Sequence, residues 1–179
     1  MHVERLTTLT ALLADPSRLV TTVLEDWCGT AVRAEVRHRS EESLATSAAG
    51  FGTVVSAAFP PLAEVVGLLR LSDGAHLQLR EVGLGAGGGD LVRAEAVVAL
   101  DRVNTDEVAV LRTSDTPLGL ALSAGGVRRR LAAAPELAQA RGTVPETADA
   151  PVLVVTAVLC RESVPVALVR ETFLRRTLG

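Results

Sequence analysis

The chain has 179 residues, of which 48% are hydrophobic and 22% charged, and its formal net charge is −3; this size predicts one domain over residues 1–179. The negative charge and the low aromatic content of 2% disfavour a nucleic-acid partner, because they leave neither a basic surface nor a stacking surface. The cysteines lie far apart, no signal peptide is evident, and no apolar run reaches about 18 residues, so we expect a cytoplasmic protein with no metal and no membrane partner.

Two helices are predicted before the first strand. Apolar residues recur at helical spacing from Val3 to Leu13, which predicts a helix that ends near Ala14. The stretch "DPSRLVTTVLEDW", residues 15–27, predicts a second helix with Asp15 as its cap, and Gly29 is expected to end it. Residues 30–39 alternate and predict a strand, whereas 40–60 predicts a loop in which 52–57 could add a short strand.

The rest of the chain alternates between helical and strand patterns. A short helix is expected at 61–69, followed by two strands joined by "GAGGGD"; because a strand follows these glycines, they indicate a hairpin rather than a phosphate loop. Asn104 and Glu107 have the spacing of a capping box, a short helix is expected from Asp115 to Gly125, and residues 127–150 are expected to mix helix and loop. Strands at 151–160 and 165–175 complete an α+β fold with an antiparallel sheet.

Charged residues interrupt three of these strand patterns. Arg80 alternates with Gln78, Val82 and Leu84, and Glu171 lies on a face with apolar neighbours. In "LVRAEAVVAL", Arg93 and Glu95 share a face with Leu91 and Val97. Because a buried charge is costly unless it is paired, one explanation is a structural ion pair from Arg80 to Glu171 or Glu95. The alternative is a cavity in which Arg80 awaits a substrate carboxylate and Glu171 handles protons.

Two predicted helix starts lie near Pro16 to Thr21 and near Pro117 to Gly119. Free backbone N–H groups and the helix dipole at such starts favour an anion. The same residues are equally consistent with ordinary capped helix ends. The histidines are isolated, and no serine lies in a nucleophile-elbow motif, so no nucleophile is predicted.

Three segments together resemble the chorismate lyase (chorismate–pyruvate lyase) family, whose fold also underlies the UTRA ligand-sensing domain of bacterial repressors. They are "LQLREVGL", "TPLGLAL" and "LVRETFL", and they occur in the family's order. The similarity covers residues 12–179, with 40–60 unmatched. It implies a six-stranded antiparallel sheet with helical flaps over one face, and cofactor-free cleavage of chorismate to 4-hydroxybenzoate and pyruvate.

The resemblance also implies roles for particular residues. Arg80 would bind the ring carboxylate, Glu171 would act as the acid, and backbone N–H groups near Val20 and Leu118 would complete the anion site. The flap positions concerned are Val20, Thr21, Leu118 and Gly119. The expected partner is a small-molecule carboxylate, bound by a monomer or a homodimer.

This chain departs from the family at Glu95, where relatives carry an arginine, and at Ala99, where they carry a proline. A carboxylate at Glu95 would repel an acidic substrate, and Arg93, two residues earlier, would compensate. Three functions are therefore considered: a chorismate lyase, a biosynthetic enzyme for another small molecule, and a non-catalytic UTRA-like ligand-binding module. About 30 residues precede the first predicted strand, which we expect to be too few for a winged-helix DNA reader.

Overall fold

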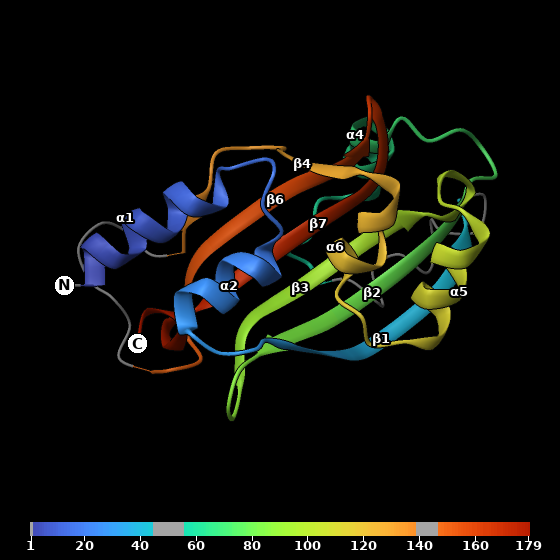
Figure 1. The fold of residues 1–179 in the computed structure, drawn as a ribbon. Helices are drawn as coiled ribbons and strands as arrows, with labels where there is room; N and C mark the ends of the chain where they lie inside the picture. The colour runs from blue at the N-terminus through green and yellow to red at the C-terminus, as the bar shows by residue number, and fades with distance from the viewer. Residues whose placement is uncertain (1, 45–55, 139–146) are drawn as a thin grey trace.

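A computed structural model describes residues 2–44, 56–138 and 147–179. Its main feature is a seven-stranded antiparallel sheet with the strand order β1-β2-β3-β7-β6-β4, in which β5 pairs separately with β6 (Figure 1). The strands are β1 (Arg33–Ser43), β2 (His76–Gly85), β3 (Asp90–Ala99), β4 (Val127–Leu131), β5 (Glu136–Leu137), β6 (Pro151–Arg161) and β7 (Val164–Leu174). The predicted α+β class is confirmed, with one strand more than expected among the described residues.

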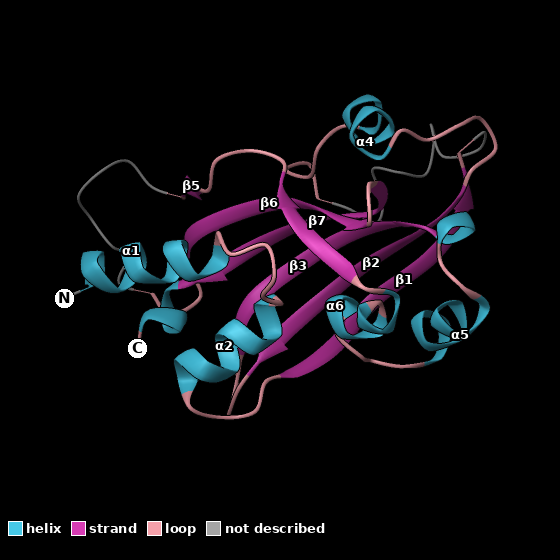
Figure 2. Ribbon diagram, turned by 45° about the horizontal axis from the view of Figure 1, so that its top comes forward, coloured by secondary structure: helices cyan, strands magenta, loops and turns pink. Residues whose placement is uncertain are grey.

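Helices cover both faces of the sheet unequally (Figure 2). One face carries α1 (His2–Leu13), α2 (Val20–Cys28), α5 (Thr105–Thr113) and α6 (Leu118–Ala121), whereas α4 (Leu62–Leu69) lies on the other face. The core divides accordingly, because alternate residues of a strand point to opposite faces. Val82 and Leu84 pack with α1 and α2, whereas Leu77 and Leu79 pack with α4.

Several sequence predictions are confirmed. Helix α1 ends at Leu13, α4 follows Pro61, and the glycine stretch links β2 to β3 as an antiparallel hairpin. Asn104 and Glu107 form both hydrogen bonds of a capping box at the start of α5. Local signals of this kind succeed because periodicity, caps and turns act over a few residues.

Other predictions are wrong. Helix α2 begins at Val20 instead of near Asp15, since the Asp15 carboxylate accepts hydrogen bonds from the backbone and hydroxyl of Ser17 in a local turn. The first strand is displaced toward the C-terminus and runs to Ser43. Residues 127–131, expected to be helix or loop, form β4, an outer strand paired with β6. The possible strand at 52–57 lies largely outside the described residues.

No helix in the described part of the chain is both long enough and apolar enough to cross a membrane. Likewise, the side chains in the described ranges form no group of three or more His, Cys, Asp or Glu residues able to hold a metal ion.

Candidate functional site

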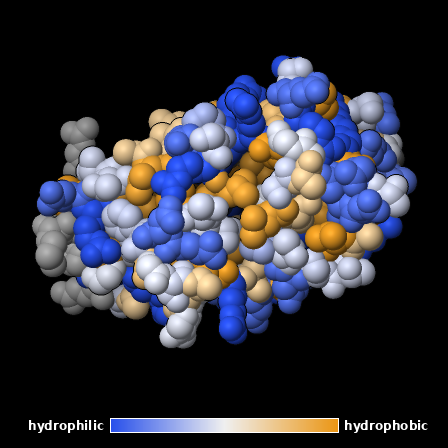
Figure 3. Space-filling view, viewed as in Figure 1, coloured by the Kyte–Doolittle hydropathy of each residue, from blue (hydrophilic) through white to orange (hydrophobic). Residues whose placement is uncertain are grey.

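A cavity of about 60 Å³ lies between the sheet and the starts of α2 and α6. Hydrophobic side chains gather around a hollow at this place on the surface of the molecule (Figure 3). The cavity floor comes from β2, β3, β7 and β6, and its walls are mostly apolar. The apolar side chains that contribute are Leu19, Val20, Val82, Leu84, Ala94, Ala96, Pro117, Leu118, Leu159 and Val169.

Arg80 reaches the cavity from β2 and is 1% exposed. Within the described residues its guanidinium makes one hydrogen bond, from Nη2 to the carbonyl oxygen of Thr116 at 3.3 Å, whereas its Nε and Nη1 atoms have no partner. The pKa of Arg80 is lowered to about 10, mainly by burial and also by nearby Arg39, whereas Asp115 opposes the shift. Among the residues that the structure describes, the guanidinium is thus a buried cation with no counter-ion in contact, and burying a cation in this way is costly.

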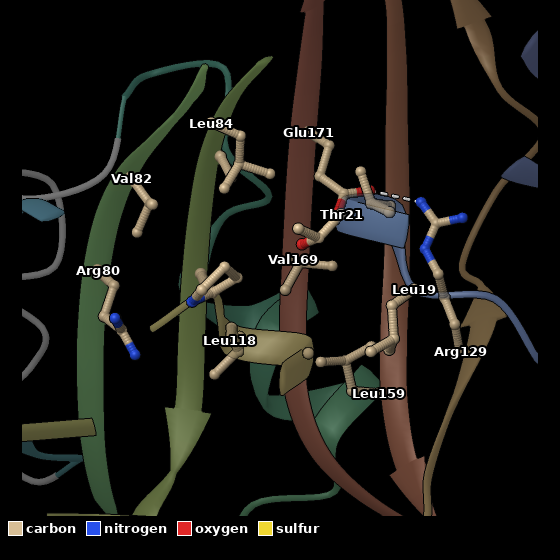
Figure 4. A pocket seen from close by; sticks show the side chains of 15 residues that line it. Leu19, Thr21, Arg80, Val82, Leu84, Leu118, Arg129, Leu159, Val169 and Glu171 are labelled. Carbon is tan, nitrogen blue, oxygen red and sulfur yellow. Dashed lines mark hydrogen bonds and ion pairs between the residues drawn. The ribbon is translucent and has the colours of Figure 1, made fainter. Parts of the chain in front are cut away.

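Glu171 and Arg129 form an ion pair on the opposite side of the cavity (Figure 4). Arg129 Nη2 lies 2.5 Å from Glu171 Oε2, and the two side chains are 4% and 10% exposed. Arg129 Nη1 also donates to the carbonyl oxygen of Leu13, at the end of α1. The carboxylate therefore has a cation inside the protein, and the pair as a whole contributes no net charge to the cavity.

The helices α2 and α6 form two flaps, and the first residues of each lie over the cavity. Val20 and Thr21 begin α2, Leu118 and Gly119 begin α6, and all four line the cavity. The flaps approach each other closely at Gly119, because a Cβ there would lie 2.9 Å from Leu19 Cδ2. A larger side chain at this position would require the end of the Leu19 side chain to move.

Arg93 and Glu95, expected to line the site, lie elsewhere. Their neighbours Ala94 and Ala96 face the cavity, so strand alternation turns Arg93 and Glu95 to the opposite face of the sheet. Arg93 is paired with Asp90 at 3.7 Å. Glu95 instead contacts Arg170 at 3.5 Å and the backbone N–H of Ser56. The expected repulsion between Glu95 and a ligand therefore has no basis in this geometry.

Neither ion pair suggested by the sequence pattern is found among the described residues. Glu171 is paired with Arg129, Glu95 with Arg170, and Arg80 with neither carboxylate. Arg129 was missed because residues 127–150 were expected to mix helix and loop. Its signal was present in "VRRRL": as a strand, this stretch points the middle arginine to the face opposite that of its two charged neighbours.

Neither the comparison with family models nor the search of curated proteins gave a match. Solved structures do match. PhnF from Mycobacterium smegmatis has a TM-score of 0.59 at 14% identity over 90% of this chain, which spans 66% of the PhnF chain. Its effector domain alone gives 0.57 at 15% identity over 87% of this chain and 88% of that one. The possible transcriptional regulator YydK from Bacillus subtilis gives 0.51 at 14% identity, covering 92% and 65%.

These comparisons correct the functional expectation. The prediction of an enzyme of the chorismate lyase type is contradicted, since the matched structures are an effector domain and a possible transcriptional regulator. The pairing of Glu171 with Arg129 gives a physical reason, because the predicted acid is already engaged as a carboxylate. The exclusion of a nucleic-acid partner is likewise unsupported, since composition describes the net charge of this domain and not what the whole protein binds. The chain shares its fold with these domains, which supports the UTRA part of the resemblance.

Proposed function

We propose that this chain is a non-catalytic ligand-binding domain that holds a small acidic molecule in the cavity under α2 and α6. The observation that carries the proposal is Arg80, a guanidinium that is 1% exposed and has two nitrogen atoms without partners in the described structure. An anionic group at this position would supply the missing hydrogen bonds and neutralise the charge. Charge-assisted hydrogen bonds of this kind are among the stronger polar contacts in proteins.

The remainder of the cavity favours a ligand with an acidic head and an apolar body. The walls next to Arg80 are aliphatic. The other two charged residues of the cavity, Glu171 and Arg129, neutralise each other. A ligand would therefore gain its electrostatic energy at one end and its hydrophobic contact area along the rest of its length.

Binding would be coupled to the position of the flaps. The cavity of about 60 Å³ is well below the roughly 300–1,000 Å³ of typical ligand pockets, so a ligand larger than a few atoms requires α2 and α6 to separate. A ligand that binds the open arrangement more tightly shifts the population toward it. This is the property that an effector-sensing domain needs, and the similarity to the effector domain of PhnF supports the same function.

The proposal is tested by identifying the bound molecule. We expect native mass spectrometry of the purified protein to detect a co-purified acid, and calorimetry with that acid to show binding that Arg80→Met abolishes. Arg93→Met is the matched control, because Arg93 lies on the other face of the sheet and is 49% exposed. The control should bind normally.

Two results would contradict the proposal. One is acid binding that survives Arg80→Met, which would place the ligand elsewhere. The other is recovery of the acid in a chemically altered form after incubation with the protein, since a sensing domain returns its ligand unchanged.

A further inference from the structure

A second arginine lies beside Arg80 on the same face of the sheet. In the antiparallel pairing of β1 with β2, Arg39 is directly opposite Arg80, and directly opposed residues of neighbouring strands point to the same face. Two like charges in this position repel each other, and this repulsion contributes to the lowered pKa of Arg80. The Arg39 side chain is 24% exposed, so solvent screens it only in part.

Both guanidiniums are directed at the end of α5 and the segment that joins it to α6. Arg39 donates from Nη1 to the carbonyl oxygen of Arg112 and from Nη2 to that of Ser114, the latter at 2.7 Å. Arg80 donates to the carbonyl oxygen of Thr116 at 3.3 Å. Carbonyl groups carry partial charges, so these contacts position the segment without neutralising either cation. Arg39 Nε has no partner within the described part of the chain.

Negative charge near the two arginines is scarce in the described residues. Asp115 Oδ1 lies 3.8 Å from Arg39 Nη2, but the Asp115 side chain is 66% exposed, so water weakens the interaction. Glu41 forms a bidentate pair with Arg112 at 2.7 Å and is thereby neutralised. Two cations are thus balanced by one exposed carboxylate, which leaves an excess of positive charge beside the cavity.

We propose that Arg39 is a second electrostatic determinant of the ligand site, and that the site prefers a head group bearing two negative charges, as in a phosphate monoester, over a singly charged group of the same shape. This inference rests on the proposed function, because it assumes that an anion binds at Arg80. Coulomb energy is proportional to the charge of the ligand. A nearby cation that does not contact the ligand therefore stabilises a dianion twice as strongly as a monoanion.

The inference is tested with two small probes of matched shape, methyl phosphate and methyl sulfate. At pH 8 the first carries two negative charges, because its second pKa is about 6, and the second carries one. We expect calorimetry at low ionic strength to show tighter binding of methyl phosphate to the unaltered protein. Arg39→Gln should weaken methyl sulfate binding about 3-fold and methyl phosphate binding about 10-fold, the larger factor being close to the square of the smaller.

Two further variants separate the charge of Arg39 from its structural role. Arg39→Lys keeps the charge but loses the paired carbonyl contacts, so it should retain most of the preference for methyl phosphate. Arg37→Gln is the matched control: Arg37 lies on the same strand, but its guanidinium lies beside Gly83 and contacts Asp90 at 2.5 Å, away from the cavity. It should leave both affinities unchanged.

Each possible result bears on either this inference or the proposed function. If Arg39→Gln weakens both probes by the same factor, Arg39 acts only by holding the segment between α5 and α6, and the preference for a dianion is overturned. That preference is also overturned if the unaltered protein binds its co-purified acid but binds the two probes equally well. If Arg80→Met changes the binding of neither the acid nor the probes, the proposed function itself fails.

Discussion

A buried arginine lies at each end of the cavity, and the two arginines differ in the partners of their guanidiniums. At one end, Arg129 is held by Glu171 and by the carbonyl oxygen of Leu13, so its charge and much of its hydrogen-bonding capacity are satisfied by the protein. At the other end, Arg80 is at least as deeply buried and has a single carbonyl partner among the described residues. The two side chains are of the same type, on the same face of one sheet, within a single cavity.

Under the proposed function, Arg129 stabilises the fold and Arg80 binds the ligand. A buried cation with its own counter-ion stabilises the packing of the elements that supply the pair, here β4, β7 and the end of α1. A buried cation without one lowers the stability of the empty protein and recovers that energy when an anion binds. The comparison makes stability measurements informative about function, since the two arginines should respond in opposite directions to the same substitution.

The largest effect is expected at Arg129. Arg129→Met leaves Glu171 as a buried, unpaired carboxylate, and breaking a buried pair in this way destabilises a protein by about 3–5 kcal/mol. The free energy of unfolding, measured by urea denaturation, should fall by this amount. Arg128→Met on the same strand is the control, because Arg128 is exposed, and it should change the stability little.

A double substitution tests the cause of that loss. Arg129→Met with Glu171→Leu removes both charges, so it should recover most of the lost free energy of unfolding. If the double variant is as unstable as Arg129→Met alone, the loss arises from packing or from the contact with Leu13. The claim that the ion pair with Glu171 stabilises this end of the cavity would then be contradicted.

An effect of the opposite sign is expected at Arg80. Arg80→Met removes a buried cation that has no counter-ion in the described part of the chain, so the free energy of unfolding of the ligand-free protein should rise by about 1–2 kcal/mol. Urea denaturation after removal of any co-purified acid measures this. A decrease comparable with that of Arg129→Met would show that Arg80 is structural, which would contradict its proposed role.

The smallest effect is expected at the partly exposed pair of Glu41 and Arg112, whose side chains are 35% and 54% exposed. Hydrogen bonds from Arg112 hold the pKa of Glu41 below its ordinary value of 4.5. Because the folded pKa is depressed, the stabilisation is complete above about pH 4.5 and is lost as the pH falls through the folded pKa. Glu41→Gln should therefore lower the free energy of unfolding at pH 7 by less than about 1 kcal/mol.

The pH dependence provides the decisive measurement for this pair. The stability of Glu41→Gln should decline less steeply with acid below pH 4.5 than that of the unaltered protein. Glu42→Gln, at the next position on β1, is the control and should leave the acid decline unchanged. Identical declines in all three proteins would show that the Glu41–Arg112 pair contributes nothing measurable.

Much of the candidate site followed from short sequence patterns. Alternation along β2 and β7 put Arg80 and Glu171 among apolar neighbours, and helix-start signals identified Leu118 and Gly119. These predictions depend on the spacing of neighbouring residues, which the sequence contains directly. The expected roles of Arg93 and Glu95 came from a resemblance to other proteins, and here strand alternation places both on the other face.

The sequence by itself determined the α+β class, the hairpins, the capping box of α5 and the presence of an arginine and a glutamate on inward faces of two strands. Only the tertiary structure decided their partners: Glu171 pairs with Arg129, from a strand that was not expected, and Arg80 has no counter-ion in contact among the described residues. The physical reason is range. Backbone periodicity and capping involve residues within about one helical turn, whereas Arg129 and Glu171 are 42 positions apart and meet only because β4, β6 and β7 pair side by side.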